Sequence, residues 1–153
     1  MTKRVAVEEF PVAKSSQRRR PDGVDDNTVE ALGKLSEALE TVERARGYLY
    51  DFHQLVGGAD IKLDEAATMF ENAGHPDIAA KIRTELIGLN VLDGRWTFQV
   101  VEEFDDGYWS TFRAVEKHAR DNLVQGVRHV FEAEMKEDRR TEGRVGHEPE
   151  PPH

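Results

Sequence analysis

Four carboxylates and six aromatic side chains crowd into one short stretch of the chain, residues 96–112. The acids are Glu102, Glu103, Asp105 and Asp106; the aromatics, half of the chain's twelve, are Trp96, Phe98, Phe104, Tyr108, Trp109 and Phe112. Aromatic rings beside acids can form a pocket for a cationic or sugar-like ligand, or an anchor for a partner protein. Two of the carboxylates could act as acid and base if burial separated their pKa values. Aromatics at helical spacing are more often core residues, so both alternatives stay open.

The histidines lack the spacing of a two-metal centre, in which Glu-x-x-His pairs face the interior of a bundle. No carboxylate stands three residues before any of the four central histidines, His53, His75, His118 and His129. On one continuous helix, His118 and His129 would share a face but lie about 16 Å apart along the axis. We therefore expect no metal site and no cofactor. His118, His129 and Glu132 remain weaker candidates, because His129 and Glu132 are adjacent on a helix surface.

The nucleophile motifs are missing as well. Cysteine is absent, which excludes disulfides, thiolate ligands and cysteine nucleophiles. The chain has no G-x-S-x-G elbow and no glycine-rich phosphate loop, and Ser110 has no histidine at a useful sequence distance. We assign no catalytic residue, and the sequence favours a non-enzymatic protein over an enzyme.

The elements that must position these residues are helices. Apolar residues recur every seven positions at Leu35, Val42, Leu49 and Val56, and Ala38, Ala45 and Phe52 widen the stripe. This pattern predicts a helix over about 27–56. Asp25, Asp26 and Asn27 are its N-cap candidates, and Gly57 and Gly58 are expected to end it.

Three further helices are predicted downstream. The first covers about 62–73 and ends at Gly74; the second begins at Pro76, with His75 just outside, and reaches about 91. Residues 96–106 fit both a strand and a helix, and we prefer a helix because a strand there would have no partner. That last helix is predicted to run to 137, and Gly107 is where it would kink.

The chain is therefore expected to be all-α: a helical bundle of about four helices, two long and two short. Its folded domain spans 25–138, between a disordered basic arm (1–24) and a disordered tail rich in proline and charge (139–153). A winged helix-turn-helix, with 91–104 as the wing, is the alternative. The segment that would enter the DNA groove has only Lys81 and Arg83 as basic residues.

Charge is distributed unevenly along the chain. Residues 1–23 carry a net charge of +3. Residues 24–153 carry −12, which gives the chain its net charge of −9. An acidic body repels nucleic acid, so only the N-terminal arm could bind it; alternatively the arm contacts the protein's own acidic surface. No apolar run is long enough to cross a membrane, and no secretory signal is evident, so we expect a cytoplasmic protein.

Two hypotheses about function follow. The first is a non-enzymatic helical interaction or adaptor protein that binds a protein partner or itself, because the stripe from Leu35 to Val56 suits pairing with a second copy. Its partner surface would be the aromatic and acidic stretch 96–112 or the remaining apolar stripe of the first helix. The second is a bundle that binds a small ligand or metal, including an enzyme, through the acids of that stretch. We choose the first.

Overall fold

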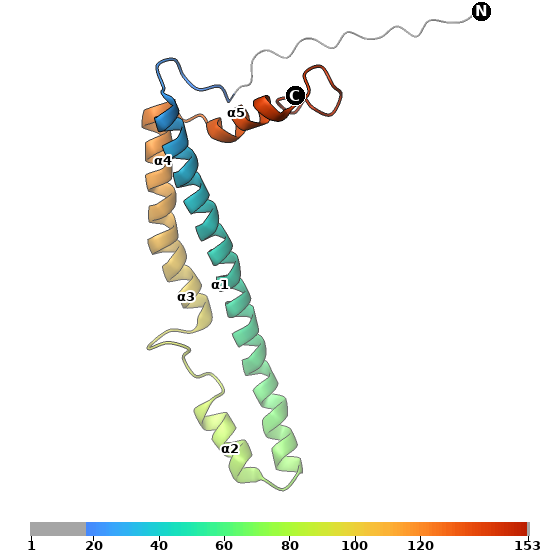
Figure 1. The fold of residues 1–153 in the computed structure, drawn as a ribbon. Coiled ribbons are helices and arrows are strands. Elements are labelled where there is room, and N and C mark those ends of the chain that lie inside the picture. Colours follow the sequence, from blue (N-terminus) through green and yellow to red (C-terminus); the bar gives the residue numbers. More distant parts are fainter. Residues whose placement is uncertain (1–17, 153) are drawn as a thin grey trace, which may run out of the picture. The chain divides into compact units, whose positions relative to one another are not determined.

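The computed structural model describes residues 18–152, and its regular elements are all helices (Figure 1). They are α1 (Asp26–Asn72), α2 (Pro76–Glu85), α3 (Thr97–Phe104), the π-helical segment η1 (Asp105–Trp109), α4 (Ser110–Val124) and α5 (Val130–Arg139). Because α3, η1 and α4 follow one another without a break, residues 18–152 form four continuous helical segments. The prediction of an all-α bundle with four helices is confirmed.

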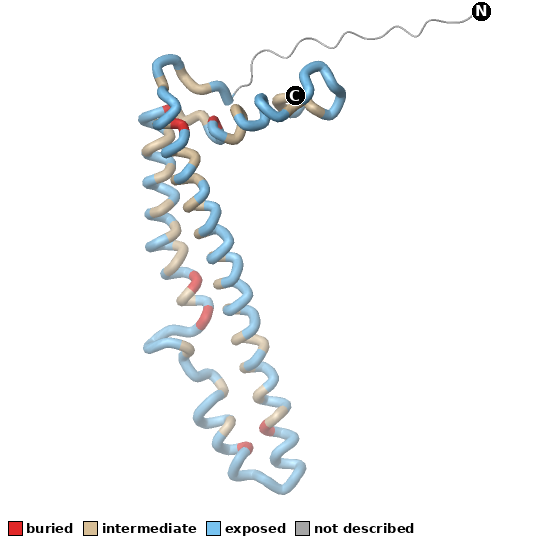
Figure 2. The backbone as a smooth tube through the Cα atoms, viewed as in Figure 1, coloured by how far each residue is buried: buried red, intermediate tan, exposed pale blue. Residues whose placement is uncertain are grey.

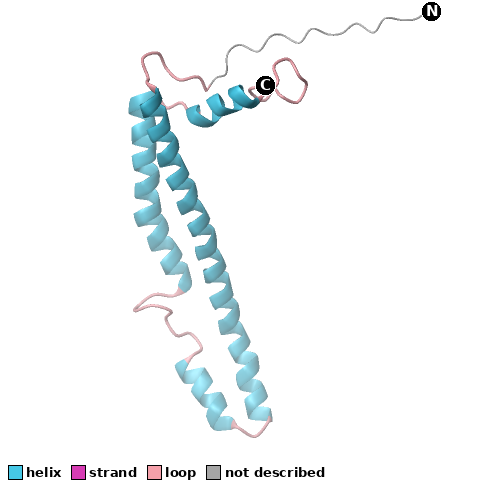
Figure 3. Ribbon diagram, viewed as in Figure 1, coloured by secondary structure: helices cyan, strands magenta, loops and turns pink. Residues whose placement is uncertain are grey.

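The winged alternative is wrong, because residues 97–104 of its proposed wing form α3. Residues 18–152 contain no strand (Figure 3), and their single bridge, between Leu92 and Arg95, closes a tight turn at Gly94. A one-residue bridge cannot form a sheet. The preference for a helix over 96–106 is confirmed from Thr97 onward.

The chain divides into two compact units. One contains residues 35–116; the other combines residues up to 34 with residues from 117 onward. Helices α1 and α4 each pass from one unit into the other. The single bundle domain expected over 25–138 stays a prediction.

Helix α1 is longer than predicted. It begins as expected at Asp25, whose side chain accepts a hydrogen bond from the Thr28 backbone N–H at 2.8 Å. It then continues through Gly57 and Gly58, and neither glycine has a positive φ. The expected end at these glycines is wrong, since the segment predicted as a separate helix over 62–73 is the end of α1. A glycine costs a helix only about 1 kcal/mol, which contacts on both sides of the pair can offset.

The boundary between the two helices around Pro76 lies where the sequence predicts it. Gly74, with φ of +86°, follows the end of α1, and His75 is the N-cap of α2. Pro76 occupies the first turn of α2, where no backbone N–H is needed. Helix α2 ends at Glu85 rather than 91, because the chain turns at Gly88 (φ +76°).

The last predicted helix is broken in two. Helix α4 ends at Val124, and Gly126 (φ +75°) donates its N–H back to the Arg120 carbonyl at 3.1 Å. The bond closes the end of α4 over two residues with positive φ, Gln125 and Gly126. Helix α5 starts only after His129, whose φ is +59°. The predicted continuous helix from 96 to 137 is therefore wrong beyond Val124.

A small core holds together the unit formed by the two ends of the chain. Val29, Val124 and Val130 are buried, and Val24, Leu32 and Val127 pack around them (Figure 2). Arg20 ties the chain before α1 to α5 by a two-point ion pair with Glu134, at 2.7 and 2.8 Å. Its third nitrogen, Nη1, bonds Asp26 at 2.8 Å. This basic residue thus contacts the protein's own acidic groups.

Residues 140–152 form neither a helix nor a strand. Within the C-terminal tail, the Thr141 backbone N–H bonds the His147 ring at 3.2 Å and Lys136 bonds the Pro149 carbonyl at 3.1 Å. Most of the predicted basic arm (1–24) falls on residues 1–17, which lie outside the described residues. Disorder of either end stays a prediction.

Candidate interaction surface

Within the unit of residues 35–116, one stripe of α1 is covered along its whole length. Its residues alternate in steps of four and three, as in a coiled-coil seam, and each is buried or half-buried: Leu35, Leu39, Val42, Arg46, Leu49, His53, Val56, Asp60, Leu63 and Ala67. We call these residues the covered seam. The stripe from Leu35 to Val56 that the sequence offered for pairing with a second copy is thus already partly covered within the chain.

Three polar residues occupy the covered seam at intervals of seven, and each bonds a different part of the facing chain. Arg46 binds Asp105, and His53 Nδ1 lies 2.7 Å from the hydroxyl oxygen of Thr97. Asp60 accepts the backbone N–H of Gly88 at 2.9 Å. Polar groups at seam positions fix the register of paired helices, because a slip would leave them unsatisfied.

Arg46 is the centre of the most elaborate of these contacts. Its Nε and Nη2 bind the two oxygens of Asp105 at 2.7 and 2.9 Å. Its guanidinium also lies over the Trp109 ring, 4.1 Å from the centroid, and Arg113 lies 4.6 Å from the same ring. The Trp109 indole N–H donates to Glu43 at 2.9 Å. The hydrogen bonds from Arg46 hold the pKa of the Asp105 carboxyl below its ordinary value.

Asp105 and Trp109, the first and last residues of the π-helical segment, both reach Arg46. Residues four apart are neighbours on a helix surface, in a π turn as in an α turn. The Ser110 hydroxyl donates to the carbonyls of Asp106 and Gly107, at 2.7 and 3.1 Å, and so supports the widened turn. The irregularity expected at Gly107 is therefore a π turn.

The predicted acids do not converge. Asp105 faces Arg46, whereas Glu103 pairs with Arg95 at 2.6 Å in an exposed contact. Glu102 and Asp106 are exposed on α3 and η1. Among residues 18–152, no group of three or more histidine or acidic side chains gathers closely enough to hold a metal ion.

The predicted aromatics divide into two sets. Trp109 is held between arginines, and the Trp96 indole donates to the Leu89 carbonyl at 3.1 Å. Phe104, Tyr108 and Phe112 form a row with ring centroids 5.7 and 5.9 Å apart. Tyr108 is 58 % exposed, and Phe98 is exposed on α3. The expected partner surface thus contains one aromatic row, in which Tyr108 is exposed and Phe104 and Phe112 are half-buried.

The weaker candidates lie in the other unit and are not gathered there. His118 contacts Asn122, four residues along α4. His129 Nδ1 lies 3.9 Å from the nearer Glu132 oxygen, as an exposed pair. The prediction that His118 and His129 share one helix face is wrong, because the break at Gly126 separates α4 from α5.

The sequence interpretation missed a second stripe on α1. It repeats the four-three spacing over nine positions: Thr41, Ala45, Tyr48, Phe52, Leu55, Ala59, Lys62, Ala66 and Met69. All but Ala66 are exposed, with Leu55 at 73 % and Tyr48 at 70 %. We call these residues the exposed seam. Ala45, Phe52 and Ala66 are predicted from the sequence as apolar-face residues, but of other stripes; a search for a second heptad frame would have found the rest.

The two seams lie about 100° apart around α1, because each exposed-seam residue from Thr41 to Ala66 directly precedes a covered-seam residue and each residue turns the helix by about 100°. Glu43 and Tyr50, which flank the Arg46 cluster, lie on the opposite side of the covered seam from the exposed seam. On the facing helix, Phe104, Tyr108 and Phe112 lie on the edge away from Asp105 and Trp109. Helical geometry therefore places the aromatic row on the same edge of the helix pair as the exposed seam.

Compared with models of protein families, with curated proteins and with solved structures, the chain matches none of them. None of the helices among the described residues combines the length and the apolar character that a membrane span requires.

Proposed function

We propose that this chain is a non-enzymatic helical interaction protein, of adaptor type, that associates with itself or another protein through the exposed seam of α1. The observation that carries the proposal is the second heptad stripe: a helix whose covered seam already pairs within the chain repeats the same spacing on an exposed face. Such a repeat is the pattern that selects helical partners.

The amount of burial supports the same proposal. Among residues 35–116, only Thr97, Ala67, Ala79 and Val101 are buried. A pair of helices covers one stripe on each, whereas bundles of four cover two, so a helix with two apolar stripes has a place for another helix. The aromatic row, exposed at Tyr108, borders this place and enlarges the apolar surface.

Two predictions from the sequence accompany the proposal. The acidic body disfavours nucleic acid, so any such contact is expected only through the basic N-terminal arm. A cytoplasmic location is expected from the lack of cysteine.

The test compares two substitutions to aspartate in α1. The two positions are equally exposed, but only one of them lies on the exposed seam. Leu55 lies on the exposed seam and is 73 % exposed; Ile61 lies off it and is 72 % exposed. Sedimentation velocity over a range of protein concentrations should show association of the unmodified chain. Leu55→Asp should weaken it by at least about tenfold, whereas Ile61→Asp should change it by less than about threefold. Equal effects of the two substitutions, with unchanged helical circular dichroism, would contradict the proposal.

A further inference from the structure

We propose that the exposed seam of α1 pairs with the exposed seam of a second copy in antiparallel orientation, with the twofold axis passing between Phe52 and Leu55. This inference rests on the proposed function and adds the identity of the partner and the register of the pairing. The evidence is the distribution of size and charge along the nine seam positions.

Lys62 sets the orientation. It is exposed and occupies the seventh of the nine seam positions. A parallel pair in register would place the two Lys62 ammonium groups opposite each other in the interface, which is unfavourable. In the antiparallel pair, Lys62 lies opposite Ala45 of the second copy. Its aliphatic stem can then cover the alanine while its ammonium reaches water.

Side-chain size agrees with a register centred between residues 53 and 54. Tyr48 then faces Ala59 of the second copy, and Phe52 faces Leu55. Each layer is repeated by symmetry on the other side of the axis. The rings of Tyr48 and Phe52 thus pack against an alanine and a leucine of the second copy. No two large side chains lie opposite each other toward the ends of the seam.

Charge beside the seam distinguishes this register from its neighbours. Arg44, Asp51, Gly58 and Glu65 follow one edge of the seam at intervals of seven. In the proposed register, Arg44 lies beside Glu65 of the second copy, and the symmetry gives two such attractive pairs. A shift of one heptad in one direction brings Asp51 beside Glu65, and a shift in the other direction brings Asp51 beside its own copy. Both shifts replace attraction by repulsion.

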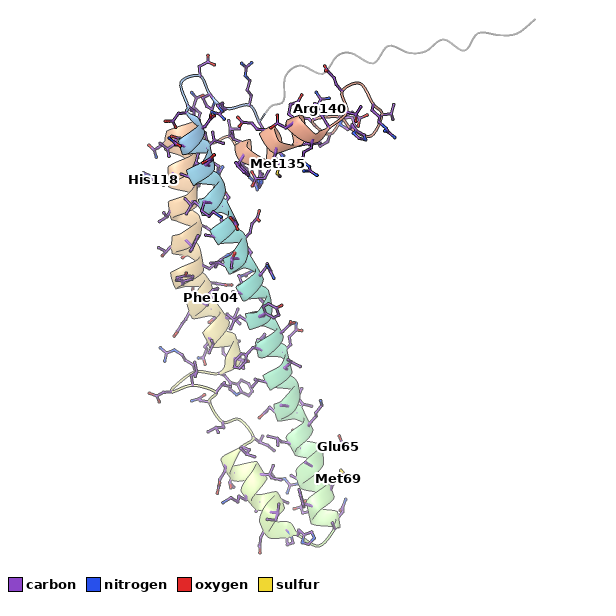
Figure 4. All side chains as sticks on the ribbon, in the orientation of Figure 1. Glu65, Met69, Phe104, His118, Met135 and Arg140 are labelled. Atoms are coloured by element: carbon purple, nitrogen blue, oxygen red, sulfur yellow. The ribbon has the colours of Figure 1, made fainter. Side chains whose placement is uncertain are left out.

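The side chains that this register uses are available. Arg44 and Glu65 are exposed, and neither makes an ion pair with another residue of 18–152. Figure 4 shows Glu65 and Met69 on the side of α1 that faces away from α2. The edge of α1 with the proposed charges is therefore open to a second copy.

The test reverses the two charges separately and then mixes the variants. Arg44→Glu alone, or Glu65→Arg alone, should weaken self-association on the order of tenfold, because each places like charges together. An equimolar mixture of the two variants should associate about as tightly as the unmodified chain, since each mixed pair restores both attractions. Arg139→Glu, at an exposed position of α5, serves as a control for net charge.

Three results are distinguishable by sedimentation velocity. If each single variant self-associates weakly and the mixture of the two associates tightly, the antiparallel register is supported. Association that is lost in Leu55→Asp but shows no preference for the mixture overturns the register and leaves the interaction function intact. An unmodified chain that stays monomeric up to millimolar concentration overturns the pairing with a second copy.

Discussion

Arg46 and Asp105, 59 residues apart in the sequence, form a two-point ion pair with both N–O distances below 3 Å. The pair joins the middle of α1 to the π-helical segment η1, and both side chains are largely covered. The same guanidinium stacks on Trp109, which lies one π turn further on. The contact therefore determines which turn of the facing helix lies beside which turn of α1.

Removing the charge of Asp105 tests this relationship. Asp105→Asn keeps the size of the side chain but breaks one of the two charge-assisted bonds to Arg46. We expect the midpoint of thermal unfolding, followed by circular dichroism, to fall by several degrees. Glu102→Gln is the matched control. It removes the same charge from the same continuous helical segment, but at an exposed residue. An equal fall in both variants would show that net charge rather than the pair is responsible.

Acid should weaken the same contact. The hydrogen bonds from Arg46 lower the pKa of Asp105 below its ordinary value of 3.8, so the unfolded chain binds a proton more readily than the folded one. The stabilisation is complete above the unfolded pKa and is lost as the pH falls through the folded value. Urea unfolding between pH 7 and pH 2 should therefore show a loss of stability below about pH 4. Asp105→Asn should reduce that loss, and an unchanged pH profile in this variant would contradict the assignment.

The contact between His53 and Thr97 makes a separate prediction. Thr97 is only 5 % exposed, and its hydroxyl oxygen lies 2.7 Å from His53 Nδ1. Thr97→Val keeps the shape but removes the hydrogen bond, so the free energy of unfolding should fall by about 1 kcal/mol. Thr68→Val, at an exposed α1 position, should cost less than about 0.5 kcal/mol. Urea denaturation measures both, and equal losses would contradict a role for the buried contact.

Two glycines of α1 should respond differently to alanine. A Cβ added at Gly47 would meet no atom within 4 Å, whereas one at Gly33 would lie 3.0 Å from the Phe131 ring. Gly47→Ala should raise the free energy of unfolding by about 0.5–1 kcal/mol through helix propensity. Gly33→Ala should gain less than half as much, because Phe131 must move. A larger gain at Gly33 than at Gly47 in chemical denaturation would contradict the packing described here.

Most of the elements could be predicted from local signals in the sequence. Asp25 as the N-cap of α1 and Pro76 at the start of α2 follow from backbone requirements at helix ends. The end of α4 was also readable, since Gly126 is a C-cap glycine, but the apolar spacing on both sides concealed it. Gly57 and Gly58 led to a wrong prediction of a helix end. Their weak helix propensity is overridden by the covered seam, which continues on both sides of them.

The candidate surface could be predicted only in part. Spacing alone identified the aromatic and acidic stretch, but it could not show that Arg46 binds Asp105 across 59 residues. The use of the Leu35 stripe within the chain rather than between copies also depends on tertiary structure. The residues of the exposed seam, such as Tyr48 and Leu55, can be read from the sequence. Two heptad frames overlap on this helix, however, and the sequence does not show which of them is covered by the rest of the chain.

The antiparallel pairing of α1 can be measured directly with spin labels, because the chain has no cysteine of its own. Gln54→Cys and Thr68→Cys place single labels on exposed residues off the seam, and double electron–electron resonance gives the distance between copies. The axial separation should be close to zero for residue 54, beside the twofold axis, and about 40 Å for residue 68, at 1.5 Å per residue. Residue 68 should therefore give much the longer distance. Equal distances at both positions, or no distance between copies at all, would contradict the account.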